Sequence, residues 1–98
     1  MKNSVEAKKR CARVAAILKT LAHPQRLFVL CCLVQGEATV SELRRESGAS
    51  QSVISQHLTR MRREGLVQAR RSGNFVHYRI TDPKLSELIQ NMEKIFNE

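Results

Sequence analysis

Residues 51 to 63 combine short hydroxyl and amide side chains near the start of the segment with arginines near its end. At about 100° per residue, Ile54, Leu58 and Met61 fall on one face of a helix, and the polar side chains fall on the opposite face. Hydroxyls and amides can form hydrogen bonds with base edges in a DNA major groove, whereas arginines mostly bind phosphate. The pattern predicts a DNA recognition helix at about 51–64. Its predicted contact residues are Gln51, Ser52, Ser55, Gln56, His57, Thr59, Arg60 and Arg63.

His57 lies at the margin of the apolar face of this helix, so two interpretations are open for it. An imidazole that points partly inward packs against the protein, whereas an imidazole that points outward contacts a base. His23 and His77 are far from His57 in the sequence, and the spacing of these histidines is not that of a metal site.

The chain is strongly basic, with a formal net charge of +8 and a pI of about 10.1 over 98 residues. Between residues 39 and 80 the sequence contains arginines but no lysine. Arginine is the side chain that binds phosphate and guanine through two hydrogen bonds. This charge indicates a polyanionic partner. The sequence has no Trp and only 4% aromatic residues, which disfavours a protein that stacks single-stranded bases on aromatic rings.

Apolar spacing and capping residues predict five helices. The expected helices run over about 4–22, 24–34, 39–47 and 51–64, and the last begins at about residue 82. Thr39 and Glu42 form a predicted capping box at the start of the short third helix, and Ser50 caps the next helix after a turn at Gly48. A short helix, a tight turn and a longer helix are typical of a helix-turn-helix.

A change from helical to alternating periodicity predicts a β-hairpin wing at about 67–80, with Gly73 and Asn74 in its turn. Arg70 and Arg71 make the wing basic, and we expect both to contact DNA beside the recognition helix. The predicted fold class is mainly α with a small β-hairpin. The order of helix, helix, helix-turn-helix, hairpin and helix predicts one winged helix-turn-helix domain over 1–98.

The first and last helices each carry an apolar stripe. The first stripe is Cys11, Val14, Ala15, Leu18 and Leu21, and the last is Leu85, Leu88, Ile89, Met92, Ile95 and Phe96. A chain of this length buries only about 60–65% of its extended surface. Because the last stripe is wider than the remaining core requires, we expect a homodimer formed by these helices. Cys11 and Cys31 are both expected on core-facing stripes.

Four motifs are spread along the chain. They are Leu21-Ala-His-Pro-Gln-Arg-Leu, Ser50-Gln-Ser-Val-Ile-Ser-Gln-His-Leu, Met61-Arg-Arg-Glu-Gly-Leu-Val and the wing through Tyr78. Together they resemble the ArsR/SmtB family of bacterial transcriptional repressors. The resemblance implies a homodimer formed by the first and last helices, and recognition helices in successive major grooves of an imperfectly palindromic operator. It also implies wings near the flanking minor grooves.

Family members that sense metals use a cysteine pair in the third helix, or histidine with carboxylates in the last helix. Here the segment from Glu42 to Glu46 has no cysteine and the last helix has no histidine. We therefore expect neither a metal nor a cofactor. A metal site that combines Cys11, Cys31 or Cys32 with another group stays open as an alternative.

The segment Arg26-Leu-Phe-Val-Leu-Cys31-Cys-Leu resembles the second helix of the BigR/HlyU branch of the family. The resemblance implies a response to sulfide or oxidants through paired cysteines, but Asn97 stands about where the branch has the second cysteine. The candidate redox residues are Cys11, Cys31 and Cys32. Two alternatives stay open: derepression by thiol oxidation or reactive sulfur, with Cys11 replacing the missing partner of Cys31, and regulation without a small-molecule effector.

These features predict a homodimeric repressor of transcription whose partners are double-stranded DNA and a second copy of the chain. We expect it in the cytoplasm and not in a membrane, because no apolar run spans a bilayer and the cysteines form a poor disulfide framework. The alternative is a winged helix of another class that binds RNA or protein. An enzyme is not expected, because no nucleophile–base pair or paired carboxylates occur at meaningful spacing.

Overall fold

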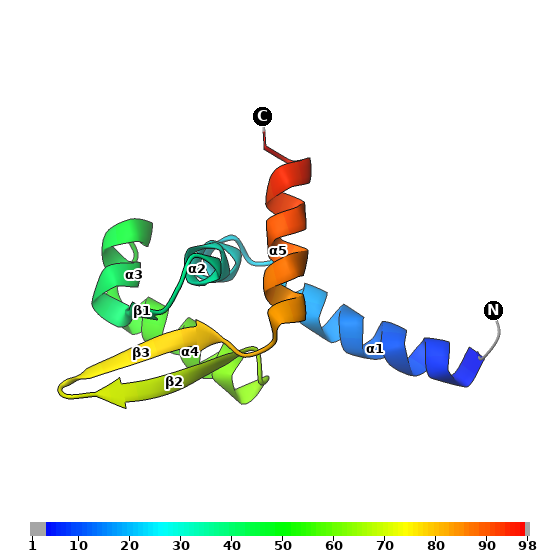
Figure 1. The fold of residues 1–98 in the computed structure, drawn as a ribbon, viewed down its shortest axis with the longest axis horizontal. Helices are drawn as coiled ribbons and strands as arrows, with labels where there is room; N and C mark the ends of the chain where they lie inside the picture. Colours follow the sequence, from blue (N-terminus) through cyan, green and yellow to red (C-terminus); the bar gives the residue numbers. More distant parts are fainter. Residues whose placement is uncertain (1–3, 98) are drawn as a thin grey trace.

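The computed structural model describes residues 4–97, so residues 1–3 and 98 of the expected domain lie outside the described part. Its elements are α1 (Ser4–Leu21), α2 (Pro24–Val34), β1 (Ala38–Thr39), α3 (Val40–Ser47), α4 (Gln51–Arg63), β2 (Val67–Ser72), β3 (Phe75–Ile80) and α5 (Pro83–Ile95). The β2–β3 hairpin extends to one side of the helices and α1 extends to the other (Figure 1). The predicted winged helix-turn-helix, mainly α with a small β-hairpin, is confirmed.

Side-chain caps determine where α3 and α4 begin. The Thr39 hydroxyl accepts a hydrogen bond from the Glu42 N–H at 3.2 Å, and the Glu42 carboxylate accepts one from the Thr39 N–H at 2.9 Å, which is the predicted capping box. Ser50 caps α4 by accepting a hydrogen bond from the Val53 N–H at 3.2 Å. Between them Gly48 has a left-handed φ of 73°, which lets the chain turn sharply from α3 into α4.

A short third strand, β1, joins the hairpin to form a sheet in the order β1-β3-β2. Ala38 lies opposite Tyr78 and Thr39 lies opposite His77. The sequence did not predict this strand, because two residues are too few to show an alternating pattern. The pairing attaches the segment between α2 and α3 to the wing.

The core lies between α2, α3, α4, α5 and the inner face of the sheet. Its most deeply buried apolar side chains are Val29, Leu30, Leu43, Ile54, Leu58, Met61, Val67 and Ile89. Burial of each such side chain contributes about 1.5–3 kcal/mol. Because three of them belong to one face of α4, packing fixes which face of α4 points outward.

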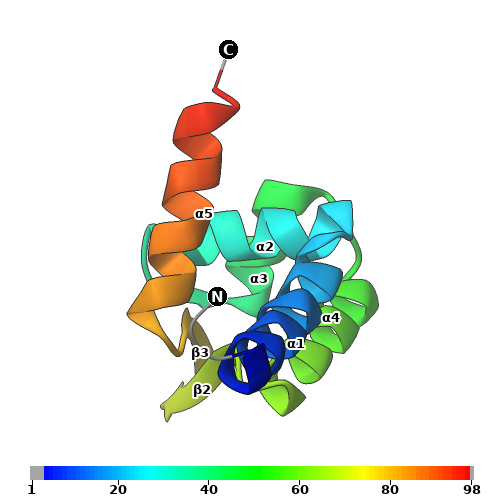
Figure 2. The same cartoon turned by 90° about the vertical axis from the view of Figure 1, so that its right-hand side faces the viewer.

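α1 packs against the rest of the chain through its C-terminal end. Thr20 and Leu21 are buried there, whereas Val14 is 41% exposed and Leu18 is 45% exposed. The prediction that Cys11 faces the core was wrong for the single chain, because Cys11 is exposed. The N-terminal part of α1 projects from the body of the molecule (Figure 1), and α1 is seen nearly end-on in Figure 2.

A set of hydrogen bonds joins the end of α1 to the end of α4. The Thr20 hydroxyl donates to the Glu64 carboxylate at 2.7 Å, and the Arg60 Nε donates to the other oxygen of Glu64 at 3.4 Å. The Arg26 Nε donates to the Thr20 carbonyl at 3.0 Å. These contacts connect α1, α2 and α4 at one place.

Within residues 4–97 no single helix is long and apolar enough to cross a membrane. α1 and α2 taken together reach that length and composition, but a bend of 99° separates them. Several apolar side chains of α2, among them Val29, Leu30 and Leu33, are buried in the core.

Candidate nucleic-acid interface

The outer face of α4 carries the predicted recognition residues. Gln51, Ser52, Gln56, Thr59 and Arg63 are exposed, and Ser55 and Arg60 are half-buried. One shallow hollow on the surface is lined by Ser52, Ser55, Gln56, Thr59, Arg60 and Arg63. The structure therefore gathers these predicted side chains on one accessible face, where a helix offers hydrogen-bonding groups to a groove.

Charge along α4 increases toward its C-terminal end. The first turn has no acidic residue, and the last turn contains Arg60, Arg62 and Arg63. Arg60 pairs with Glu64 at 3.4 Å, whereas Arg62 and Arg63 are exposed. The hydroxyl and amide groups thus lie on the first turns of α4, and its cationic groups lie at the other end.

His57 is half-buried and joins α4 to the start of α2. Its Nε2 lies 3.0 Å from the Gln25 side-chain oxygen, and its ring lies 4.8 Å from the ring of His23, centroid to centroid. Burial lowers the pKa of His57, and the neighbouring His23, Arg26 and Arg60 lower it further. This environment favours the packing interpretation of His57 over base contact. His23 and His57 are 34 positions apart in the sequence, and only the fold brings the two rings together.

The two wing arginines lie in different environments. Arg70 makes two hydrogen bonds to Glu37, from Nη2 at 2.8 Å and from Nε at 3.2 Å. Arg71 is exposed and has no partner among residues 4–97. Adjacent residues of a strand point to opposite faces, so the two guanidinium groups leave the sheet on opposite sides. The sequence did not predict the contact of Glu37 with Arg70, because Glu37 lies outside the wing and no spacing relates the two residues.

α3 and the following turn present a second basic area. Ser41, Arg44, Arg45, Gly48 and Ala49 line a shallow hollow there. Arg44 and Arg45 are exposed. In a helix-turn-helix the helix before the recognition helix crosses the DNA backbone, so these arginines are suited to phosphate. Neither arginine is among the contact residues predicted from the sequence.

The sequence matches the profile of the family described as "Bacterial regulatory protein, arsR family" over residues 23–69, which span α2 to β2. A biofilm growth-associated repressor of Xylella fastidiosa is 41% identical over 91 residues, covering 93% of this chain and 80% of that protein. The chain belongs to the arsR family. This arsR-family chain is also 34% identical to the transcriptional activator HlyU of Vibrio cholerae, over 96% of the chain and 87% of HlyU.

Solved structures of arsR-family relatives have the same fold. The repressor BigR from Xylella fastidiosa superposes with a TM-score of 0.87 at 39% identity, covering 96% of both chains. A homodimeric winged helix-turn-helix domain of Mb0332 from Mycobacterium bovis superposes with a TM-score of 0.81 at 30% identity, covering 94% of this chain and 85% of that one. The arsR-family chain is thus a DNA-binding transcriptional regulator, and not an enzyme.

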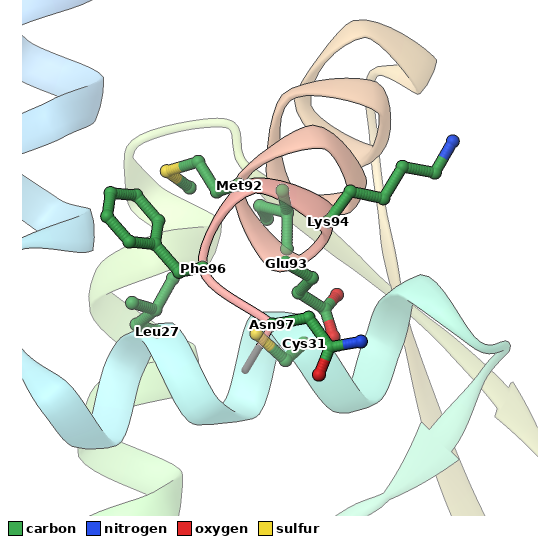
Figure 3. A pocket seen from close by; sticks show the side chains of 8 residues that line it. Leu27, Cys31, Met92, Glu93, Lys94, Phe96 and Asn97 are labelled. Carbon is green, nitrogen blue, oxygen red and sulfur yellow. The ribbon is translucent and has the colours of Figure 1, made fainter.

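Cys31 of this arsR-family chain lines a pocket between α2 and the end of α5 (Figure 3). Glu93, Phe96 and Asn97 project into the same space from the α5 side, and no residue of α1 lines it. Burial raises the pKa of the Cys31 thiol, as do the negative charge of Glu93 and the neighbouring Cys32. Burial also raises the pKa of Cys32, with further contributions from Glu46 and Glu93.

The structure does not assemble the three candidate redox residues in one place. Cys11 is exposed on α1, whereas Cys31 and Cys32 are half-buried on α2. Glu93 and Asn97 line the same pocket as Cys31, and Asn97 stands about where the resemblance implies a cysteine in the BigR/HlyU branch. Within residues 4–97 no three His, Cys, Asp or Glu side chains gather as metal ligands.

Proposed function

We propose that this regulator is a repressor that binds an imperfectly palindromic operator as a homodimer. Each protomer inserts α4 into a major groove, and the two α4 helices lie about one DNA turn, ~34–36 Å, apart. The observation that carries the proposal is the outer face of α4, where six polar and basic side chains line one hollow while the opposite face is buried. A dimer bound across a promoter excludes RNA polymerase.

Within this proposal the residues of α4 and of its neighbouring elements have two roles. Gln51, Ser52, Ser55, Gln56 and Thr59 contact base edges, because hydroxyls and amides can recognise the major-groove pattern. Phosphate is bound by the basic side chains around them, which are Arg44, Arg45, Arg60, Arg63 and Arg71. Arg70 contributes less than Arg71, because Glu37 already neutralises it.

The exposed apolar residues of the terminal helices support the dimer. Val14 and Leu18 lie on α1, and Ile95 and Phe96, 72% and 77% exposed, lie at the end of α5. A groove of about 750 Å³ also runs between α1, the end of α4 and the start of α5. Exposed apolar side chains grouped on two helices are typical of an interface between subunits. The homodimeric Mycobacterium bovis relative supports the same assembly.

Repression is proposed over activation because the relative with 41% identity is a repressor, whereas the activator HlyU is 34% identical. Transcription from a template that carries the binding site distinguishes the two directions. Added protein should lower the amount of transcript. An increase in transcript would contradict repression and leave specific DNA binding in place.

The experiment that tests the proposal compares binding to a duplex selected from a random pool with binding to an unselected duplex. The selected duplex should bind about 10³-fold more tightly at the same salt concentration. Equal affinity for both duplexes would contradict it, and tighter binding of single-stranded RNA would favour a winged helix of another class.

Oligomeric state tests the assembly separately. Leu18→Glu should convert the dimer to a monomer and weaken operator binding, because a charge would be buried in the interface. Ala12→Glu, at an exposed position outside the apolar stripe of α1, is the matched control and should leave a dimer. Sedimentation measures both. A monomeric parent protein, or a dimeric Leu18→Glu variant, would contradict an interface on this stripe.

Regulation by oxidation or reactive sulfur at Cys31 is a hypothesis that the pocket between α2 and α5 supports. The raised pKa of Cys31 keeps its thiol protonated at neutral pH, so we expect the reaction of Cys31 with oxidants to be slow. Operator-bound protein should therefore be titrated with peroxide and with polysulfide, and the thiols mapped by mass. Release that is absent in Cys31→Ser supports the hypothesis, whereas retention of DNA by modified protein supports regulation without an effector.

A further inference from the structure

Phe75 is an apolar side chain exposed in an unusual place. Residues 4–97 contain seven large apolar side chains that are exposed. Five of them lie on helices, which are Val5, Val14, Leu18, Phe28 and Ile95, and Phe96 directly follows α5. Phe75 alone among them lies on the wing, where it is 62% exposed. It is not part of the hydrophobic core, so packing within the chain does not account for a phenylalanine there.

The strand register defines the surface to which Phe75 belongs. Phe75 lies opposite Ser72, directly beside the turn, and His77 lies opposite Arg70. Because alternate residues of a strand share a face, Phe75, His77 and Arg79 are on the same side of the sheet as Arg70. The other side carries Tyr78 and Ile80, which pack against the core. Phe75 is thus the outermost residue of a surface that also carries Arg79 and the ion pair of Arg70 with Glu37.

The hairpin carries this surface away from the body of the molecule (Figure 1). All residues from Arg70 to Phe75 are exposed, so the end of the wing is free to contact a partner. Proteins that bind the minor groove often combine basic side chains with an apolar side chain, frequently phenylalanine, that inserts at a base step. The end of the wing offers both kinds of group, with Phe75 on one face of the hairpin and Arg71 on the other.

We propose that Phe75 makes an apolar contact with the minor groove of DNA that flanks the site bound by α4. The inference rests on the proposed function and adds a contact that does not depend on charge. The guanine amino group projects from the floor of the minor groove and would obstruct the ring. The ring therefore packs where that group is absent. Phe75 therefore contributes to preference for A·T pairs in the flank.

The test compares Phe75→Ala with the parent protein on two duplexes that share the selected site. One duplex continues into A·T flanks and the other ends at the segment bound by α4. On the long duplex Phe75→Ala should bind about tenfold more weakly, within the range found for contacts between aromatic rings and bases. The slope of log K against log salt should not change, because no phosphate contact is lost. On the short duplex the two proteins should bind equally.

Ser72→Ala, on the same face and opposite Phe75, is the matched control and should bind both duplexes like the parent. Replacing the A·T flanks with G·C should weaken the parent but not Phe75→Ala, and I·C flanks, which lack the guanine amino group, should restore binding. Thermal unfolding of Phe75→Ala should match the parent, because the ring is outside the core. Equal binding of parent and Phe75→Ala to the long duplex would overturn the inference while leaving the proposed function intact. A parent without preference for the selected site would overturn both.

Discussion

Arg70 and Glu37 are joined by two hydrogen bonds, of 2.8 Å and 3.2 Å, between the wing and the segment that precedes β1. The Glu37 carboxylate also lies in the field of His77 and Arg79, and its hydrogen bond to Arg70 is the main cause of its lowered pKa. In the proposed complex with DNA, this carboxylate would compete with phosphate for Arg70. A residue outside the wing would then limit the contribution of Arg70 to DNA binding.

Glu37→Gln should strengthen binding to every duplex, because it releases Arg70 to phosphate. The salt dependence of log K should become steeper by about one unit. Fluorescence anisotropy at several salt concentrations measures both quantities. Glu87→Gln removes the same charge from an exposed position on α5 and is the control. Equal effects of the two variants would mean that net charge, and not the release of Arg70, is responsible.

Removing the wing arginines one at a time should give unequal results. Arg71→Ala should weaken all duplexes and flatten the salt dependence by about one unit, because Arg71 is free to bind phosphate. Arg70→Ala should change the slope less, because Glu37 already neutralises that charge. The double variant should change the slope by at most about two units. An unchanged slope in all three variants would show that the wing arginines do not touch phosphate.

Gln56→Ala and Ser55→Ala should reduce the preference for the selected site without affecting thermal unfolding. Losing a good contact to a base edge costs about 1–3 kcal/mol of discrimination. Competition between the selected and unselected duplexes measures this loss. Gln90→Ala, at an exposed position on α5, is the control for the loss of an amide. Equal weakening on both duplexes would argue that these residues do not read bases.

Stability should depend on the ionisation of His57. Burial beside His23, Arg26 and Arg60 lowers the pKa of His57 below its ordinary value of 6.5, so the folded chain binds the proton less well than the unfolded chain. The neutral imidazole therefore contributes stability that is fully present above pH 6.5 and is lost as the pH falls through the lowered pKa. Urea unfolding of the parent between pH 8 and pH 5 should show this loss as a lower free energy of unfolding at the acidic end.

His57→Gln should make that part of the pH dependence disappear, since glutamine can keep an amide contact with Gln25 and does not titrate in this range. His77→Gln, on the wing, is the control and should retain the pH dependence of the parent. A parent and a His57→Gln variant with the same pH profile would contradict the assignment of the effect to His57.

The sequence predicted most of the fold because its signals are local. Capping by Thr39, Glu42 and Ser50 and the turn at Gly48 act within a few residues, and each occurs where it was expected. β1 was missed because its two residues are defined only by their pairing with β3. Local pattern therefore predicts elements well and predicts short tertiary pairings poorly.

The candidate site was predictable to a different degree. The outer face of α4 follows from helical periodicity once Ile54, Leu58 and Met61 are known to be buried. The contacts of Arg70 with Glu37 and of His57 with Gln25 join distant parts of the chain, so no spacing indicates them. Cys11 was misassigned because an apolar stripe that lies on the surface of one chain has the same periodicity as a stripe in a core.

The contact of Thr20 with Glu64 has a mechanical consequence. The hydroxyl at the end of α1 and the carboxylate after α4 are held 2.7 Å apart, with Arg26 and Arg60 bound to the same two residues. A tilt of α1 against its neighbours must either break this junction or turn α4 with it. In the proposed dimer, a change in the angle of α1 would therefore also change the orientation of α4 toward DNA.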